Sequence, residues 1–492
     1  MTGHSVTLFQ SFVVAAILAR LISYALFQTA LTARKQISTT TLKPMTLSPF
    51  LKKVFANTSW LLSDKVIAMA ANLLVSLALA RSLGPAGFGE LSYLLALIAM
   101  VMPLAALGLN AIVTRELVNQ PDGESRVIAT ATGFRLFGAL AGTLVCLILA
   151  VTGLGLGDFK AAEQAQYALA LLAFANLFNA LAVLEFWFQA HLQAKFVVRM
   201  RLFITIAFAI FKLLAVWLHA DLVSVIAIFA LETICLGLGY VIIYRMRAGG
   251  INLQDFDFSY GVKLLKQSFW LVLSGIAAVI YLKVDQLMLQ HLATTADVGT
   301  YAVAARLSEV WYFFADAIVI SLFPAIIKLG KQANTKLYWH RLQQVSDGLF
   351  FVAVAIAVSV SLLAKPVIVL LFGADYLPSV QILQIHIWAG IFVFMRALVS
   401  KWLLAEDLLP FSLVSHGFGA IINVAANWVL IPIWGAQGAA IATLISYFIA
   451  SYLAFWLSPK TRPIAKVMSR SILLPFTLGH RYWPKTALTK RS

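Results

Sequence analysis

Six basic side chains lie inside long apolar stretches of the sequence, away from the charged segments between those stretches. They are Lys65, Arg135, Lys212, Lys283, Arg306 and Arg396. On insertion scales a charge at the centre of a bilayer costs at least about 2.5 kcal/mol, so each side chain should face a bundle interior, water or a carboxylate. Cations held in this way are candidates for binding an anionic substrate.

The same stretches carry six acidic residues, which allow a second interpretation. They are Asp64, Glu185, Glu232, Asp285, Glu309 and Asp316. Ion pairs between the two sets could simply hold helices in register, and for any single residue this structural role is as plausible as function. For the whole set function is favoured, because redundant buried ion pairs contribute little stability.

One stretch places such residues at helical spacing. Arg306 is followed by Glu309, Phe313 and Asp316, a pattern that lines one face of a helix. From Gly299 at the outer end, a rise of about 1.5 Å per residue puts Glu309 roughly 15 Å deep, near the bilayer midplane. A polar stripe at this depth requires a polar cavity.

The composition indicates a membrane protein. The 492 residues are 61% hydrophobic and 12% charged, whereas average usage is about 45 to 50% apolar and about 25% charged. The net charge of +17 could suggest nucleic acid, but the basic residues collect in alternate short loops and in the C-terminal tail. This distribution is typical of membrane insertion, so we expect a polytopic protein in a lipid bilayer with no nucleic-acid partner.

Length, apolarity and breaker residues predict an all-α fold with twelve transmembrane helices. The predicted helices span residues 57–80, 88–113, 127–151, 164–188, 197–218, 222–244, 267–291, 299–327, 347–372, 379–404, 410–431 and 436–457.

Lys and Arg between these helices predict the orientation. One side holds most of them, including Arg115 and Arg201, whereas the other side holds only Arg81, Lys160 and Lys365. Both ends of the core should therefore be cytoplasmic. Because each half has an even number of helices, the halves should form two six-helix lobes related as parallel repeats, with a substrate path between them.

An internal duplication is consistent with that arrangement. Trp60 aligns with Trp270 and Gly89 with Gly299, both at an offset of 210 residues (270 − 60 and 299 − 89). Few residues are identical, and chance similarity between apolar segments is the alternative.

We expect four segments. Residues 1–50 form an N-terminal extension outside the transporter core, either as an additional membrane helix or as sequence upstream of a start at Met45. Residues 51–250 form the first six-helix lobe, 251–458 the second, and 459–492 a basic cytoplasmic tail.

Several absences limit the function. The sequence contains no G-x-x-x-x-G-K-[ST] segment, and the predicted outer loops are too short for the external domain of a membrane glycosyltransferase or polymerase. Cys146 and Cys235 lie in apolar runs, which favours small core residues over a disulfide or a metal site. We expect no enzyme activity, no metal and no cofactor.

Six segments together resemble a known family. They are NTSWLLSDK at Asn57, LARSLGPAGFGELSY at Leu79, LGLNAIVTREL at Leu107, EFWFQAHLQA at Glu185, ARLSEVWYFFADAIVISLFPAI at Ala305 and IPIWGAQGAAIATLISY at Ile431. The sequence from about residue 57 to 457 is similar to bacterial oligosaccharide flippases of the Wzx type, which belong with multidrug exporters and lipid II flippases in one superfamily.

The resemblance implies a MATE-like fold and a substrate. The substrate would be a polyprenyl-pyrophosphate-linked oligosaccharide, moved from the cytoplasmic to the outer leaflet of the bacterial inner membrane by alternating access. Coupling to a proton or sodium gradient, and partnership with polysaccharide polymerase and chain-length proteins, are part of this expectation. The candidates for binding the coupling ion are Glu309, Asp285, Asp316 and Asp64. Two alternatives stay open: a cation-coupled multidrug exporter of the same superfamily, and a membrane polysaccharide polymerase or glycosyltransferase.

Depth along the predicted helices sorts the six cations into two tiers. Lys65, Arg135 and Arg396 each lie roughly 12 Å from the cytoplasmic ends, whereas Lys212, Lys283 and Arg306 lie in the outer half. We hypothesise that the pyrophosphate binds the lower tier first and then the upper tier, with Glu309 or Asp285 releasing it when a coupling ion changes their charge.

The predicted orientation can be tested by thiol labelling of intact cells. Single cysteines at Ala86, Thr295 and Gln437 should react with an impermeant reagent from outside, because these positions lie in outer loops. Cysteines at Asn334 and Ser469 should not react. Labelling at Asn334 without labelling at Thr295 would invert the orientation.

Overall fold

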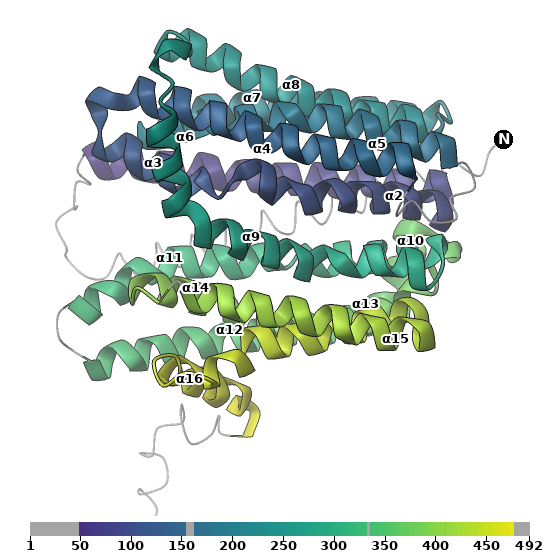
Figure 1. Ribbon diagram of the computed structural model, residues 1–492. Helices are drawn as coiled ribbons and strands as arrows, with labels where there is room; N and C mark the ends of the chain where they lie inside the picture. Colours follow the sequence, from purple (N-terminus) through teal and green to yellow (C-terminus); the bar gives the residue numbers. More distant parts are fainter. Residues whose placement is uncertain (1–48, 154–161, 332–334, 409, 477–492) are drawn as a thin grey trace, which may run out of the picture.

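The computed structural model describes residues 49–153, 162–331, 335–408 and 410–476, and every regular element in these ranges is a helix. The helices form two bundles that lie side by side (Figure 1). Nearly all of the predicted N-terminal extension and the end of the predicted tail lie outside the described residues. The all-α class predicted from the sequence is confirmed.

The first bundle is built from the N-terminal half of the chain. Its helices are α2 (Pro49–Ala106), α3 (Leu109–Asn119), α4 (Glu124–Thr152), α5 (Ala162–Asn176), η2 (Leu177–Leu184), α6 (Glu185–Ala190), α7 (Ala194–Trp217) and α8 (Leu222–Ala248). A short 3-10 turn, η1 (Pro121–Gly123), precedes α4.

The second bundle follows after η3 (Leu253–Asp255). Its helices are α9 (Phe258–Leu292), α10 (Thr295–Glu309), α11 (Tyr312–Lys331), α12 (Thr335–Phe372), η4 (Ala374–Tyr376), α13 (Ser379–His386), α14 (Ala389–Ala405), α15 (Pro410–Ser451), η5 (Leu453–Trp456) and α16 (Arg462–Ile472). Asp257 caps α9 by accepting a hydrogen bond from the Tyr260 N–H (2.9 Å). That bond, with a further contribution from Arg126, lowers the pKa of Asp257.

Two helices reverse direction at a glycine. α2 is non-helical at Gly84 (φ 66°, ψ 177°) and α15 at Gly435 (φ 54°, ψ −133°). The apolar stretch Asn57–Pro103 in α2 and the stretch Pro410–Trp456, which comprises α15 and η5, have 47 residues each. As a straight helix either would be about 70 Å long, more than twice the roughly 30 Å hydrocarbon core. A Cβ on Gly438 would lie 2.2 Å from the Leu430 carbonyl oxygen, so the chain folds back between these residues. Both stretches are therefore hairpins, as the Gly- and Pro-containing turns predicted.

Five predicted helices are interrupted. The segment 88–113 is divided between α2 and α3, and 436–457 between α15 and η5; 164–188 becomes α5, η2 and α6; 299–327 becomes α10 and α11; and 379–404 becomes α13 and α14. The break after Glu309 corrects the prediction of one continuous polar stripe, because Phe313 and Asp316 belong to the next helix. No Gly or Pro marks this break in the sequence. Among the described residues nine stretches are long and apolar enough to span a membrane, and the number twelve stays a prediction.

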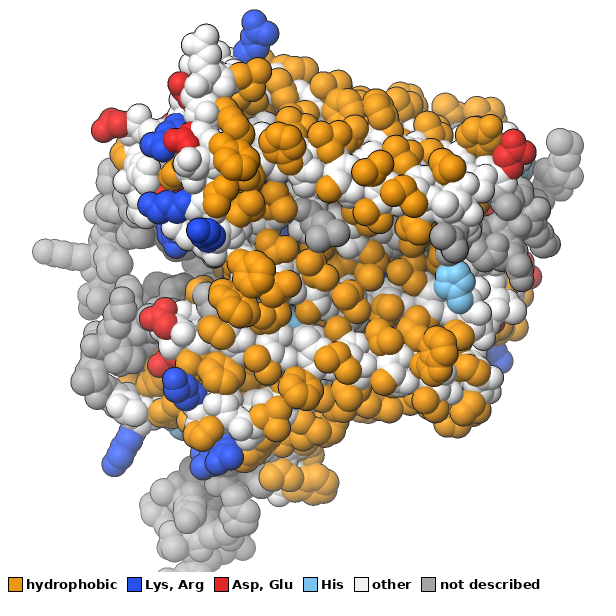
Figure 2. All heavy atoms as spheres, in the orientation of Figure 1, with side chains coloured by type: hydrophobic (Ala, Val, Ile, Leu, Met, Phe, Trp, Pro, Cys, Tyr) orange, Lys and Arg blue, Asp and Glu red, His pale blue; other side chains and the backbone are white. Residues whose placement is uncertain are grey.

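The outer surface has the polarity of a membrane protein. Large apolar side chains point outward, for example Phe137 (61% exposed), Phe203 (76%) and Leu362 (77%). Figure 2 shows a broad hydrophobic surface over the length of the helices, with most of the visible Lys and Arg gathered at the end that carries α3 and α6. A protein that exposes such a surface needs lipid around it.

The two bundles approach most closely where α2 crosses α10. A Cβ on Gly89 would lie 1.9 Å from the Thr295 carbonyl oxygen, and one on Gly299 would lie 1.9 Å from the Pro85 carbonyl oxygen. Gly89 and Gly299 are the residues that the proposed duplication places in equivalent positions. Their mutual contact is what a two-fold axis between the halves would produce.

A side chain at this crossing should open that end of the molecule. Gly299→Val would place carbon atoms on the Pro85 carbonyl, which as backbone cannot rotate away. In a Ser76→Cys background, we expect labelling of the new thiol from the α10 end to increase severalfold. Gly348→Val is the control, because a Cβ on Gly348 meets nothing within 4 Å. Equal labelling in both variants would show that the glycine crossing does not close the molecule.

Candidate functional site

Arg306 connects the two bundles. It projects from α10, and its Nη1 donates a hydrogen bond to the Ser76 hydroxyl of α2. Its guanidinium lies 5.0 Å from the centre of the Phe88 ring. Within the described chain, no carboxylate lies within ion-pair distance of Arg306. The guanidinium charge therefore has only neutral partners in this conformation.

Lys283 and Glu309 form a loose pair beside it. Lys283 Nζ lies 3.7 Å from Glu309 Oε1, and both side chains are 31% exposed. A long, partly hydrated ion pair contributes little stability and separates easily. The two charges also act on His386, as does Asp285. Lys283, Glu309, Asp285 and His386 thus belong to one polar region of the second bundle.

Lys212 is bound differently from the other cations. Its Nζ donates to Glu232 Oε2 and lies 3.6 Å from the centre of the Phe229 ring, and its side chain is only 2% exposed. The structure therefore gives this predicted substrate ligand a carboxylate partner within its own bundle. It is still near enough to interact electrostatically with Arg306.

Arg135 lies in the interior of the first bundle. It donates to Asn110 Oδ1 and to the Asn179 carbonyl, each at 3.4 Å. Its Nε is buried without a hydrogen-bond partner. These long bonds to neutral oxygens leave much of its hydrogen-bonding capacity unused.

Arg396 has a comparable position in the second bundle. It donates to Ser415 Oγ (2.7 Å) and Ser412 Oγ (3.2 Å), and it contacts His416 Nε2 (3.2 Å). The Phe455 ring lies 5.0 Å from the guanidinium. Like Arg135, this arginine has no carboxylate in ion-pair contact among the described residues.

The structure brings the cations of one predicted tier close together but not those of the other tier. Lys212 and Arg306 are electrostatic neighbours, and Lys283 pairs with the acid one turn beyond Arg306. In the other tier, Arg135 and Arg396 lie in different bundles, and Lys65 is exposed on α2. No contact between described side chains joins those three.

Asp64 belongs to a network that the sequence did not reveal. It is buried and accepts a hydrogen bond from Arg201 Nη1 (2.8 Å), and Arg201 also pairs with Glu185. Tyr240 donates to the same Glu185 carboxylate (3.2 Å). Arg201 was expected in a cytoplasmic loop, but α7 begins at Ala194 and carries it inside the bundle. Arg201 thus pairs directly with two acids, and Lys65 and Arg135 interact electrostatically with Asp64 and Glu185, respectively.

Asp285 is the most fully buried acid of the set, at 1% exposure. It accepts hydrogen bonds from Tyr301 (2.7 Å), Asn427 (2.5 Å) and Thr443 (2.9 Å). Within the described ranges no basic side chain is paired with it. Asp285 is thus a buried carboxylate whose hydrogen-bond partners in the described chain are all neutral.

The surroundings of Asp285 are rich in oxygen. Asn427 donates to Asn423 Oδ1 (3.0 Å), and both amides are completely buried. The Asn427 Oδ1 atom itself has no hydrogen-bond partner. Oxygen ligands of this kind suit a hard cation. Over the described residues no group of three His, Cys, Asp or Glu side chains is placed to hold a metal ion.

Asp316, the remaining predicted acid, is separated from this region. It is exposed on α11, beyond the break that follows Glu309.

A polar recess between α3 and α6 was also missed by sequence reasoning. Its volume is about 590 Å³, and its lining residues are Asn110, Thr114, Arg115, Val118, Asn119, Phe186 and Gln189. Arg115 donates to Gln267 of α9 (2.6 Å) and pairs with Glu116 (3.0 Å). The sequence signal was the cluster of amide side chains flanking α3, which counting charges overlooks.

Comparison with known proteins identifies relatives of the first two-thirds of the chain. Residues 54–330 match the family described as polysaccharide biosynthesis protein. The chain is 30% identical over 201 residues to the probable flippase AglR of Haloferax volcanii (38% of this chain, 40% of that protein). It is 28% identical over 142 residues to the lipid II flippase MurJ of Bacillus subtilis (28% of this chain, 26% of that protein). These alignments cover less than half the length of either relative.

Solved structures share the fold over most of the chain. A lipid II flippase MurJ structure in an inward closed conformation superposes with a TM-score of 0.66 at 15% identity, covering 86% of this chain and 93% of that one. An inward-facing MATE family multidrug transporter superposes with a TM-score of 0.61 at 13% identity, covering 81% and 95%. At such identities the comparison establishes the fold, and it confirms the MATE-like architecture.

Proposed function

Because this chain belongs to the polysaccharide biosynthesis protein family, we propose that it moves a polyprenyl-pyrophosphate-linked oligosaccharide from the cytoplasmic to the outer leaflet. The observation that carries the proposal is Arg306, a cation between the two bundles whose partners are neutral. A transporter that rocks its bundles apart would break the contact with Ser76 and expose this charge to the central path.

The pyrophosphate needs cations that are not already neutralised. Arg306 and Lys283 meet this condition best, because the first has no carboxylate partner and the second only a loose one. Arg135 and Arg396 have neutral partners as well and would bind the headgroup earlier, with Lys65 at the surface. Lys212 would act indirectly, through its electrostatic effect on Arg306. Charge-assisted bonds to phosphate are stronger than the neutral bonds they would replace.

The sugars and the polyprenyl chain of the substrate would contact other surfaces of the protein. The sugars carry many hydroxyl groups, and the recess between α3 and α6 offers amide side chains, Arg115 and the aromatic ring of Phe186. The polyprenyl chain can stay in the lipid, in contact with the apolar outer face of the bundles.

Asp285 is the proposed site for the coupling ion, either a proton or sodium. It is buried among neutral donors, and its region includes Glu309, which pairs with Lys283. Occupation of Asp285 would change the field around Lys283 and therefore its affinity for phosphate. Asp64 could play a similar part in the first bundle, where Arg201 pairs with both Asp64 and Glu185.

The competing functions have weaker support. A cationic drug would meet Arg306 and Lys283, which favour anions. A polymerase or glycosyltransferase needs an acid-base site, whereas the recess carries amides and one arginine. We further propose an inner-membrane location with cytoplasmic termini, and polysaccharide polymerase and chain-length proteins as partners.

Removal of the Arg306 charge should stop transport without loss of protein. We expect Arg306→Ala to reduce export of lipid-linked oligosaccharide at least tenfold, because the pyrophosphate loses its main ligand, while Arg306→Lys retains part of it. Membrane protein level and oligosaccharide export would be measured in the same cells. The control is Lys212→Ala, which should lower protein level by leaving the mostly enclosed Glu232 carboxylate (14% exposed) without its cation. Adding Glu232→Gln should restore that level.

Native export by a normal amount of Arg306→Ala protein would remove the central residue of the proposal. Rescue of Arg306→Ala protein level by Glu309→Gln would instead assign Arg306 a structural role.

Neutralising Asp285 should uncouple transport from the ion gradient. In proteoliposomes, we expect Asp285→Asn to abolish the acceleration produced by an imposed proton or sodium gradient, because an amide neither titrates nor supplies the carboxylate charge. Asp375→Asn in η4 is the matched control, since this acid is exposed and outside the polar region. If Asp285→Asn responds to both gradients like the unmodified protein, the coupling site lies elsewhere.

A further inference from the structure

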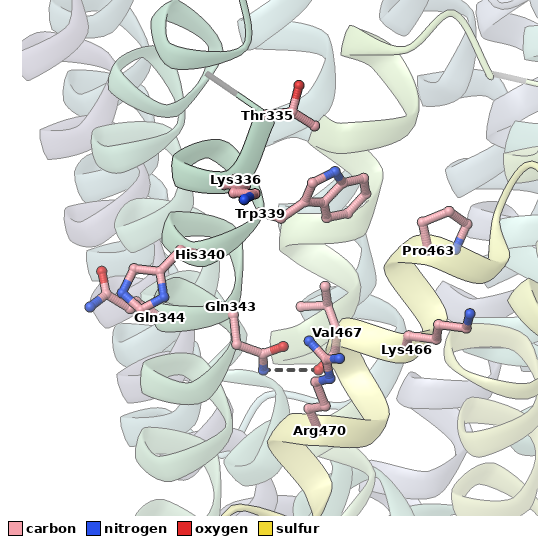
Figure 3. Close-up of a pocket in the computed structure, with 10 residues that line it drawn as sticks. All are labelled: Thr335, Lys336, Trp339, His340, Gln343, Gln344, Pro463, Lys466, Val467 and Arg470. Carbon is pink, nitrogen blue, oxygen red and sulfur yellow. Dashed lines mark hydrogen bonds between the residues drawn. The ribbon is translucent and has the colours of Figure 1, made fainter. Parts of the chain in front are cut away.

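A second cationic cavity lies outside the transport path, between the start of α12 and the terminal helix α16 (Figure 3). Its volume is about 600 Å³. The lining residues are Thr335, Lys336, Trp339, His340, Gln343, Gln344, Pro463, Lys466, Val467 and Arg470. This list contains four basic side chains and no acid.

The basic side chains come from two facing helices at helical spacing. Lys336 and His340 lie one turn apart on α12, and Lys466 and Arg470 lie one turn apart on α16. All four are exposed. Among the described residues none of them forms an ion pair. Lys336, Lys466 and Arg470 carry like charges that repel one another, and a bound anion would remove that cost. Asp347 lies behind Gln343, which donates to it (2.7 Å), and it does not line the cavity.

The cavity has rigid walls. α16 buries Ile464, Val467 and Met468 in a core shared with α12. On the same buried face, Ser471 donates to Asp347 Oδ1 (2.7 Å) and contacts Ser346 (2.8 Å). These contacts fix α16 across α12, so the cationic side chains are held on a stable scaffold.

Gln343 ties the two helices together at the floor of the cavity. Its amide donates to the Val467 carbonyl (3.1 Å), and the Arg470 side chain extends toward it (Figure 3).

The position of the cavity indicates what kind of anion reaches it. α16 lies at the edge of the second bundle, beside α12 (Figure 1). Its basic residues occupy the exposed face, while Leu473 (52% exposed) and Phe476 (86%) follow at its end. A helix with a buried apolar face, outward cations and exposed apolar residues at one end is suited to the interface of a membrane.

We infer that this cavity binds the phosphate headgroup of an anionic phospholipid in the leaflet at that end of the molecule. Lys336, Lys466 and Arg470 would bind the phosphate oxygens, and Trp339 would lie at the level of the headgroups. The acyl chains would continue along the apolar surface. Such a lipid would fix α16, and through it the start of α12, to the membrane plane. The inference does not depend on the transported substrate.

Lipid titration of the full-length purified protein tests the inference. Dioctanoyl phosphatidylglycerol, dioctanoyl phosphatidylcholine and inorganic phosphate would each be added, and binding followed by native mass spectrometry. We expect phosphatidylglycerol to bind in preference to the other two. Lys466→Gln with Arg470→Gln should weaken that binding about thirty-fold, from the usual contribution of a basic residue near an anionic membrane.

Matched variants separate this site from general charge effects. Arg245→Gln with Lys263→Gln removes two exposed cations elsewhere and should leave phosphatidylglycerol binding unchanged. Lys466→Arg with Arg470→Lys keeps the charges and should retain binding, which shows that α16 is still folded. Three results would overturn the inference: equal loss in both Gln pairs, equal binding of phosphatidylcholine, or inorganic phosphate binding as tightly as the lipid.

Discussion

A charged side chain in a bilayer costs free energy unless an opposite charge or polar groups surround it. This constraint determines where the charged residues of this protein can lie. Several charges have an opposite charge close by, as in Lys212 with Glu232 or Arg201 with Asp64 and Glu185. Arg306, Arg396 and Asp285 have neutral partners instead. Such residues lower the stability of the resting fold, and a fold retains them at that cost when a mobile ion or substrate completes them.

The closest contact between the two bundles involves backbone and few side chains. At the crossing of α2 and α10, Gly89 and Gly299 let carbonyl oxygens approach positions where any side chain would clash. A contact of this kind has no interlocking side chains to withdraw, so its separation needs little repacking. Arg306, one to two turns away on the same helix, adds a polar bond across the same interface.

The sequence predicted the architecture well and the site only in part. Apolar length and Gly- and Pro-containing turns identified the helices, because insertion into lipid depends on just those properties. The break after Glu309 and the pairing of Arg201 with Asp64 and Glu185 escaped prediction, since both result from packing between segments distant in sequence. The same holds for Asp285. The sequence shows an acidic residue at this position, but only the folded structure shows that Tyr301, Asn427 and Thr443 donate hydrogen bonds to it.

Arg306 links substrate binding to conformation in the proposed cycle. Its hydrogen bond to Ser76 exists only while α2 and α10 are together. A pyrophosphate that reaches Arg306 would offer a charge-assisted bond in place of a neutral one, so binding would favour the state in which the bundles separate. Glu309 lies one turn from Arg306 and pairs with Lys283, so an ion that changes the charge near Glu309 changes the affinity of both cations together. Substrate and coupling ion would thus act on the same pair of side chains, and this shared target is sufficient to couple them.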